Sequence, residues 1–551
     1  MKKIIFFLIG MSVSISCKKE TTDTHFKKYD ESQEIVQQQT HENIRMRFKL
    51  IQSKYIDMNK VLEPFQQDLA GFSEEEYTTL KPFIIEQDIP SIQKSIRDQK
   101  LTYEKLTLFY LYRILKYEKD STKSLQAIIS LNPNVLKEAR EKDKNTENSI
   151  DEFSLYGMPI LLKDNINTTQ MATTAGAAVL QENYTDNNAF IVQKLKESGA
   201  LILGKVNLSE WAYFFCNDCP LGYSAIGGQT LNPYGRKIFE TGGSSSGSGV
   251  AIAANYAAAA VGTETSGSIT SPSSQNSVVG LKPTIGFLSR HGIVPISSTL
   301  DTPGPMTKNV VDNAILLKTM FGYDSNDSIT SKIKDIKADY FKIQWNKEYL
   351  KDKKIGIITS LLSDAIYKKT IDKIKSAGAE IVELSPKEMN YDGFLNLLTT
   401  DMKYDLPEYL KTSASKQINV ATVKDIVVFN KKDSLKRAPY GQQLFEGIVK
   451  DTTSVETLHK VKNHLKEEGK KYLSALIDEN VDVILSINNY HSGVAAVAQY
   501  PTITVPMGYK NSGEPVSLTF IGKPLSENKL LQIGYAFEQL TKARKIPNNY
   551  Q

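Results

Sequence analysis

Residues 241–249 read Thr-Gly-Gly-Ser-Ser-Ser-Gly-Ser-Gly, and residues 262–269 read Gly-Thr-Glu-Thr-Ser-Gly-Ser-Ile. These two serine-bearing stretches lie downstream of Lys163, which follows the apolar run 158–162. A serine hydroxyl is a poor nucleophile until a base takes its proton, and a lysine can be that base when burial lowers its pKa toward neutrality. All six histidines lie outside residues 163–268, so no local histidine competes for this role. The pattern therefore predicts chemistry in which a buried lysine activates a serine.

Further strings of sequence accompany these two stretches in a fixed order. They are Leu-Leu-Lys-Asp-Asn-Ile at 161–166, Gly-Lys-Val-Asn-Leu-Ser-Glu-Trp-Ala at 204–212, Gly-Gln-Thr-Leu-Asn-Pro-Tyr at 228–234, Gly-Leu-Lys-Pro-Thr at 280–284 and Asp-Thr-Pro-Gly-Pro-Met at 301–306. On these strings the chain resembles the amidase signature family. Near-matching sequence runs from about residue 106 to 321 and returns from about 481 to 547, with a divergent stretch between.

The resemblance implies a Ser-cisSer-Lys triad made of Ser268, Ser244 and Lys163. Ser268 would attack an amide carbonyl and Ser244 would relay its proton to Lys163, after which the same path would return the proton to the departing amine. In the family the peptide bond before the bridging serine is cis, and here that bond is Gly243–Ser244. The oxyanion would be held by the backbone N–H groups of Thr265, Ser266, Gly267 and Ser268. This chemistry needs no metal ion and no organic cofactor.

Details of the motifs are similar to those of bacterial peptide amidases. The Ser-Ser-Ser-Gly-Ser core, Glu264 and residues 289–296 match that branch, whereas Ser246 departs from the commonest family form and Ser266 stands where the branch carries an acidic residue. The resemblance implies hydrolysis of carboxamide C–N bonds to carboxylate and ammonia, in peptides or small molecules. One alternative is the glutaminase subunit of a tRNA-dependent amidotransferase. Another is a catalytically inactive envelope lipoprotein that binds peptides or glycans.

The same core also satisfies Gly-x-Ser-x-Gly at residues 243–247, which offers a second interpretation. It would make Ser245 the nucleophile of an α/β-hydrolase elbow, served by a later aspartate and histidine. That elbow needs a strand before it, and residues 235–241 form only a short, mixed segment. Residues 248–260 are small and apolar and predict a buried helix.

Length and charge exclude some classes of protein. The chain has 551 residues, more than one core usually supports, so a second lobe or a long insertion is expected. Its 67 basic and 62 acidic residues give a formal net charge of +5, and the lysines are scattered. Such a surface lacks the clustered positive charge that is typical of nucleic-acid-binding proteins, so no nucleic-acid partner is expected. The pattern assigns no oligomeric state.

The first residues have the features of an export signal. Two lysines precede the apolar run 4–9, which is too short to span a membrane, and Cys17 follows at the end of the signal. Residues 1–17 resemble a bacterial lipoprotein signal cut before an acylated Cys17, although Ser14 replaces the usual leucine or valine. An ordinary secretory signal is the alternative. The lipoprotein interpretation places the protein in the bacterial cell envelope, as a periplasmic or outer-membrane lipoprotein held by a lipid anchor, with residues 18–33 as a polar tether.

The other two cysteines form a lone Cys-x-x-Cys at Cys216 and Cys219. A zinc site would need further ligands nearby, and the sequence offers none, so no metal site is predicted. In an oxidising compartment the pair could form a local disulfide or remain as two buried thiols. Neither cysteine is assigned a catalytic role.

The remaining pattern predicts an α/β fold with an added N-terminal helical region at residues 34–120. Helical spacing of apolar residues within 44–58 supports that region, and residues 121–551 would form the amidase domain. Strands are expected at 200–203, 355–359, 481–485 and 502–505, with helices at 190–196 and 365–376 between them. This alternation predicts a mixed β-sheet covered by helices on both faces. The divergent stretch at about 324–479 is helical and charged, and in the family it shapes the substrate entrance.

Overall fold

The computed structural model describes residues 23–145 and 151–551. The predicted signal and Cys17 lie outside the described residues. From Phe26 onward the predicted tether is attached to the body of the protein, because Phe26 N–H donates to Asn59 Oδ1 at 2.8 Å and Lys28 Nζ donates to the Ser53 carbonyl at 3.0 Å. The described part of this segment is therefore docked rather than free.

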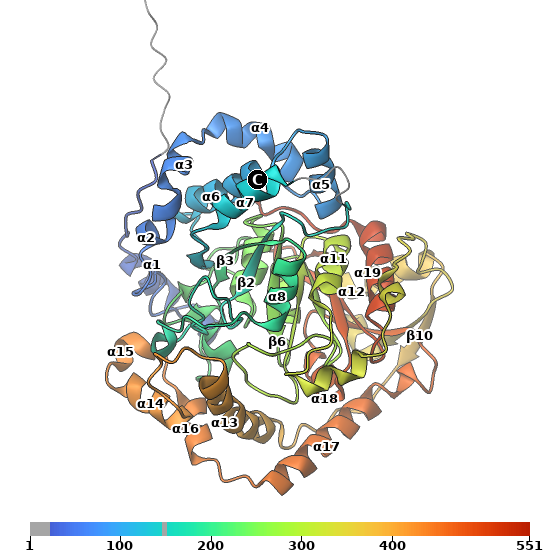
Figure 1. Cartoon of the computed structure of the whole chain (residues 1–551). Helices are drawn as coiled ribbons and strands as arrows, with labels where there is room; N and C mark the ends of the chain where they lie inside the picture. The colour runs from blue at the N-terminus through green and yellow to red at the C-terminus, as the bar shows by residue number, and fades with distance from the viewer. Residues whose placement is uncertain (1–22, 146–150) are drawn as a thin grey trace, which may run out of the picture.

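Within the described ranges, eleven strands form one mixed sheet that runs through the middle of the molecule (Figure 1). In spatial order they are β1 (Ile128–Leu131), β3 (Leu201–Val206), β2 (Pro159–Lys163), β6 (Ala259–Glu264), β8 (Thr302–Thr307), β7 (Val279–Lys282), β12 (Thr502–Tyr509), β13 (Pro515–Ile521), β11 (Val483–Ile487), β9 (Lys354–Ile358) and β10 (Glu380–Leu384). Strands β3, β2 and β6 are parallel to one another, as are β11, β9 and β10, whereas the pairs in the centre are antiparallel. A separate two-stranded ladder joins β4 (Tyr223–Ser224) and β5 (Gly228–Gln229).

Two groups of helices cover the sheet. Helices α9 (Ser246–Ala253) and α10 (Thr270–Gln275) contact each other and the central strands, while α8 (Phe190–Glu197), α11 (Val310–Met320) and α19 (Glu527–Thr541) form the other group. Further helices beside the sheet are α7 (Val135–Lys144), α12 (Ala365–Ser376) and α18 (Ser492–Ala498). Because nearly all strand residues between these layers are buried, the sheet is the centre of the core. The predicted fold class is confirmed.

The N-terminal helices form a cap over one end of the sheet (Figure 1). They are α1 (Ser32–Gln38), α2 (Met58–Leu62), α3 (Gln66–Gly71), α4 (Glu74–Ile84), α5 (Ile89–Arg97) and α6 (Tyr103–Glu118). The fully buried Arg113 of α6 ties this cap to distant parts of the chain, since it donates to the carbonyls of Ala254 and Tyr550 and to the Tyr77 hydroxyl. Moving the cap away from the body would leave this buried guanidinium without acceptors, at a large cost in free energy. The cap is therefore fixed to the body.

The helical spacing expected within residues 44–58 is wrong for most of that segment. Residues 47–57 are not helical, and Ile44 is 56% exposed. This segment bonds to the body in place of forming helical hydrogen bonds: the Ile51 carbonyl accepts from Gln229 N–H at 2.8 Å, and the Ser53 side-chain hydroxyl donates to the Ile226 carbonyl at 2.5 Å. Tertiary pairing has thus replaced the helical hydrogen bonds.

The helix expected over residues 248–260 is right at its start and wrong at its end. Helix α9 is entirely buried, but it stops at Ala253, the chain turns at Asn255 with φ of +57°, and β6 begins at Ala259. An alanine-rich run carries little information on this point, because small apolar residues fit both a buried helix and a buried strand.

The divergent stretch supplies the strands β9 and β10 and then a run of helices, drawn in orange along the lower edge of Figure 1. These helices are α13 (Phe394–Thr412), α14 (Val423–Lys431), α15 (Ser434–Arg437), α16 (Gln443–Lys450) and α17 (Val455–Tyr472). They enclose a second hydrophobic cluster, which includes Trp211, Met402 and Phe445. Among the described residues no helix combines the length and the apolar character that crossing a bilayer requires.

Candidate active site

Lys163 is the last residue of β2 and is fully buried. Its Nζ lies 2.7 Å from Ser244 Oγ, 3.1 Å from the Thr263 carbonyl oxygen and 2.9 Å from Thr263 Oγ1. Thr263 belongs to β6, the strand beside β2 in the sheet. The parallel pairing of these strands therefore brings the lysine to the end of a neighbouring strand, where its amine meets the bridging serine.

Burial is the main influence on this amine. It lowers the pKa of Lys163 from 10.5 to about 7, and the negative charges of Asp301 and Glu264 oppose the shift. A substantial fraction of the amine is therefore neutral at neutral pH. The sequence-based expectation of a lysine with a lowered pKa is confirmed.

Ser244 lies in the glycine-rich loop just before α9 and is fully buried. The Gly243–Ser244 peptide bond is cis, as the family resemblance implied. Gly242 precedes it with φ of +65°, and a Cβ at that position would lie 2.7 Å from the backbone of Pro272. Glycine is thus required at residue 242 by both the backbone conformation and the close approach of α10.

Ser268 lies in the turn between β6 and α10 and is 8% exposed. Its carbonyl accepts a hydrogen bond from the Ser245 N–H at 3.1 Å, so the two serine stretches are joined through their backbones. Glu264 holds the turn, because its Oε2 accepts from Ile269 N–H at 2.7 Å and from Thr270 N–H at 2.9 Å. Gly267 has φ of +84°, which suits glycine in this turn.

The predicted oxyanion donors lie on this turn. Among the described residues no acceptor takes the backbone N–H groups of Thr265, Ser266, Gly267 or Ser268. Unused donors beside a serine can stabilise developing negative charge on a substrate oxygen. Ser244, the bridging serine, contacts Lys163 directly. The hydroxyls of Ser244 and Ser268 are both described, and no hydrogen bond joins them in this structure.

The alternative with Ser245 as nucleophile is not supported. Residues 230–245, which the structure describes in full, contain no strand, so the predicted elbow is missing. The Ser245 hydroxyl is fully buried, donates to the Thr263 carbonyl at 3.0 Å and accepts from the Thr263 N–H at 3.2 Å. Of the described histidines, His491 bonds to Ser486 and His291 lies 3.6 Å from Asp324, so neither serves Ser245.

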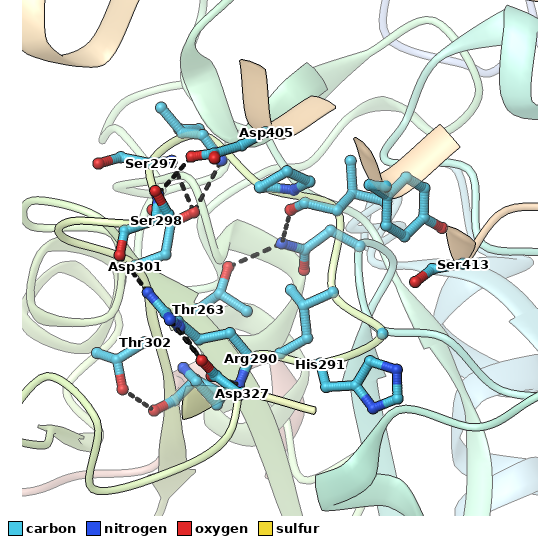
Figure 2. Close-up of a pocket in the computed structure, with 18 of the residues that line it drawn as sticks. Thr263, Arg290, His291, Ser297, Ser298, Asp301, Thr302, Asp327, Asp405 and Ser413 are labelled. Atoms are coloured by element: carbon cyan, nitrogen blue, oxygen red, sulfur yellow. Dashed lines mark hydrogen bonds and ion pairs between the residues drawn. The ribbon is translucent and has the colours of Figure 1, made fainter. Parts of the chain in front are cut away.

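A cavity of about 250 Å³ lies beside the triad. Its lining includes Thr263, which contacts Lys163, and Thr265, but none of the three triad residues. Figure 2 shows Ser297, Ser298 and Asp405 gathered on one side and His291 and Ser413 on another. Apolar residues from Ile293 to Ile296 complete the wall, and Arg290 is neutralised by a bidentate pair with Asp327. The cavity is large enough for several more atoms than a carboxamide group alone contains.

A buried ion pair lies next to Lys163 in the chain. Lys205 Nζ is 3.2 Å from Asp164 Oδ1, and both side chains are fully buried. Lys205 also donates to the Ile166 carbonyl at 2.7 Å and to Thr173 Oγ1 at 3.0 Å. Because Asp164 follows Lys163 directly in the chain, this ion pair holds the segment that carries the predicted base.

The structure joins Cys216 and Cys219 by a disulfide, with their Cα atoms 5.8 Å apart. Of the two possibilities that the sequence left open, the disulfide is therefore the one present. Within residues 23–145 and 151–551, no three side chains of the His, Cys, Asp or Glu types gather as metal ligands.

Sequence reasoning missed the roles of Thr263 and Asn165. Thr263 contacts Lys163 through its backbone carbonyl and its hydroxyl, and Asn165 Nδ2 donates to the same hydroxyl at 3.0 Å. Asn165 stands in the Lys-Asp-Asn string, so the motif pointed to it, but nothing in one sequence shows that a strand residue 98 positions away is its partner.

Comparison with known proteins agrees with this geometry. The Amidase family model matches residues 105–486. A probable amidase of Arabidopsis thaliana is 35% identical over 478 residues, covering 84% of this chain and 92% of that protein. The crystal structure of an amidase family protein from Bacillus anthracis superposes with a TM-score of 0.85 at 40% identity, covering 90% of this chain and 99% of that one. The native peptide amidase of Stenotrophomonas maltophilia superposes with a TM-score of 0.78 at 36% identity, covering 84% of this chain and 99% of that one. The chain therefore belongs to the amidase family and is an enzyme that hydrolyses amide bonds.

Proposed function

We propose that the enzyme hydrolyses carboxamides of peptides or small molecules to carboxylate and ammonia, with Ser268 as nucleophile, Ser244 as bridge and Lys163 as base. The observation that carries the proposal is the 2.7 Å contact between the buried Lys163 amine and Ser244 Oγ. The likeness to a peptide amidase at 36% identity supports the choice of substrate class.

The three contacts of Lys163 suit a neutral amine. A neutral amine has two N–H donors and one lone pair. The Thr263 carbonyl accepts one N–H and Thr263 Oγ1 accepts the other, so the lone pair is left for the Ser244 hydroxyl proton. Thr263 thereby orients the base toward the bridging serine.

The reaction then proceeds in two halves. Ser244 gives its proton to Lys163 and takes the proton of Ser268, whose Oγ bonds to the amide carbonyl carbon while the oxyanion is held by the N–H groups of residues 265–268. The proton returns through Ser244 to the amide nitrogen of the substrate, the C–N bond breaks and ammonia departs, while the acyl group stays bonded to Ser268. Water then hydrolyses this acyl-enzyme by the same proton path. The Ser244 and Ser268 hydroxyls must approach each other when substrate binds, as catalytic hydrogen bonds often do.

Activity should fall at acid pH. Only the neutral form of Lys163 accepts a proton, and its pKa is about 7, so kcat/KM should drop about tenfold per pH unit below that value. Asp301→Asn removes a negative charge that favours protonated Lys163 and should move the acid limb to lower pH. The measurement is kcat/KM against pH for both proteins. A profile that stays level down to about pH 5 would rule out lysine as the base.

The substrate class is tested by ammonia release from N-protected amino-acid amides, a free aliphatic amide, an aryl amide and glutamine, with Ser268→Ala as the blank. We expect the highest kcat/KM on the amino-acid amides. Activity confined to glutamine would favour a glutaminase subunit instead. Ammonia from none of them would favour an inactive binding protein.

We also propose that the enzyme is a lipoprotein of the bacterial cell envelope, acylated at Cys17. The support is the charge and hydropathy pattern of residues 1–17. In the native host the protein should sediment with membranes, whereas Cys17→Ala should abolish lipid attachment. Intact-mass measurement of the mature protein checks this, and a mature form that begins elsewhere or lacks acyl chains would contradict it.

A further inference from the structure

The turn between β6 and α10 needs support from outside itself. Its four backbone N–H groups at residues 265–268 bond to no acceptor among the described residues, so none of them holds the turn in place. Gly267 adds a residue whose backbone has wide conformational freedom. Donors that stabilise an oxyanion must be aimed at it before the reaction, because reorganising them would add to the barrier. Other contacts must therefore fix this turn.

The end of the turn nearest α10 is fixed by contacts described above. Glu264 accepts from the N–H groups of residues 269–270, and the Ser268 carbonyl accepts from the Ser245 N–H. These contacts hold Ser268 and the start of the helix that follows. None of them involves Thr265, the first residue of the turn.

A carboxylate fixes the beginning of the turn. The hydroxyl of Thr265, a buried residue, donates to Asp301 Oδ1 at 2.5 Å. Asp301 Oδ2 accepts from the N–H groups of Ile296 at 2.8 Å and Ser297 at 2.9 Å. Both oxygens are thus occupied by protein donors, and the carboxylate joins the turn to the loop at residues 296–301.

The loop at residues 296–301 is a firm support for this carboxylate. Asp301 N–H donates to the Ser297 carbonyl at 2.9 Å, which closes the loop on itself. Ser297 is fully buried, and its hydroxyl donates to Asp401 Oδ2 of α13 at 2.6 Å. Lys462 of α17 pairs with the other oxygen of Asp401 at 2.7 Å. The helices of the divergent stretch therefore anchor the loop that carries Asp301.

We propose that Asp301 is a positioning residue, which holds the oxyanion turn in its active shape through the Thr265 hydroxyl. This inference rests on the proposed function, in which the N–H groups of residues 265–268 bind the oxyanion. When the contact is missing, the first donor of the turn is no longer aimed at the oxyanion. The loss is felt in the transition state, where negative charge develops on the substrate oxygen, and little in the bound substrate.

Two substitutions of Thr265 test the role of its hydroxyl. Thr265→Val removes the hydroxyl but keeps the side-chain shape and the backbone N–H, whereas Thr265→Ser keeps the hydroxyl. For an N-protected amino-acid amide, Thr265→Val should lower kcat by about 10- to 100-fold and change KM by less than about threefold, because misplacing a catalytic group by about 1 Å can cost about 100-fold. Thr265→Ser should retain kcat to within about threefold. Steady-state ammonia release gives both constants.

The matched control is Thr107→Val in the N-terminal cap. Thr107 of α6 is also buried, and its hydroxyl donates to the Tyr103 carbonyl at 2.8 Å. The substitution removes a comparable hydroxyl contact in another part of the fold. It should change kcat by less than about twofold.

Asp301→Asn tests the other partner of the contact, at a pH of about 9, where Lys163 is mostly neutral. An amide has one oxygen, so it cannot accept from both the turn and the loop, and kcat should again fall by about 10- to 100-fold. In the Thr265→Val background the amide oxygen can serve the loop alone. The double variant should therefore lie within about threefold of the slower single variant.

The outcomes separate the inference from the function on which it rests. Full kcat in Thr265→Val would overturn the inference, and so would an equal loss in Thr265→Ser or in Thr107→Val. A higher KM at unchanged kcat would assign the hydroxyl to substrate binding instead, and losses that multiply in the double variant would show that Asp301 does not act through Thr265. Each of these results leaves the proposed function standing. No ammonia release by the unmodified enzyme would remove both.

Discussion

Replacing Ser268, Ser244 or Lys163 by alanine lowers kcat/KM for a carboxamide by roughly 10⁴- to 10⁶-fold, and combining the changes lowers it little further. The reason is that the three groups act as one proton-transfer path, in which the 2.7 Å contact between Lys163 and Ser244 is one link. Once any link is missing, the remaining members cannot activate the nucleophile. Steady-state ammonia release by the single, double and triple variants measures the effect.

Ser245→Ala is the matched control for these variants, because Ser245 is a buried neighbour in the same stretch. Its hydroxyl bonds only to the backbone of Thr263 among the described residues, so its loss should cost at most about 100-fold through the position of that strand. If Ser245→Ala abolished activity while Lys163→Ala retained it, the proposed triad would be wrong. Additive losses from Ser244 and Lys163 would also contradict a shared path.

Lys205→Met should destabilise the folded protein by about 3–5 kcal/mol. The change leaves the Asp164 carboxylate buried without the cation that lies 3.2 Å from it, while the Ile166 carbonyl and Thr173 hydroxyl lose a donor. An uncompensated charge in the interior costs far more than the lost contact itself. Urea denaturation followed by circular dichroism measures the loss, and activity should fall with it because Asp164 adjoins Lys163.

Two comparisons show whether the buried charge is the cause. Lys460→Met removes an exposed lysine, 75% accessible and paired with Glu456 one helical turn away, and should change stability by less than about 0.5 kcal/mol. The double variant Lys205→Met, Asp164→Asn removes both charges and should recover part of the loss. A double variant as unstable as Lys205→Met would point to packing rather than charge.

The predictions that agree best with the structure concern residues in short sequence motifs. The lysine after the apolar run 158–162 lies at the end of a buried strand and touches Ser244, and the Gly243–Ser244 bond is cis. Strands at 201–206, 354–358, 483–487 and 502–509 follow from short apolar runs bounded by turns and charges. The strands depend on nearest neighbours along the chain, which a single sequence records. The Lys163–Ser244 contact joins residues 81 positions apart and, like the cis bond, was expected from the family resemblance.

The features that sequence reasoning missed depend on partners far away in the chain. Thr263 contacts Lys163 partly through its backbone carbonyl. Every residue type has a backbone carbonyl, so no sequence pattern predicts this contact. Helical spacing of apolar side chains predicts a helix over residues 47–57, yet the Ile51 carbonyl and the Ser53 hydroxyl bond to the backbone of Gln229 and Ile226. The central strand β13 also escaped prediction, since its burial follows from the order of the sheet.

That order has a consequence for how the protein is made. Every residue of the proposed triad lies at or before Ser268 in the chain, but β7 pairs with β12, whose first residue is Thr502. An exported chain, as proposed above, emerges from its N-terminus, so the edge of β7 stays open until the roughly 220 residues between β7 and β12 have followed. An unpaired edge strand is a template for aggregation, so the nascent chain should depend on chaperones during that interval. A fragment ending at Phe321 would contain the whole triad and is expected to aggregate rather than catalyse.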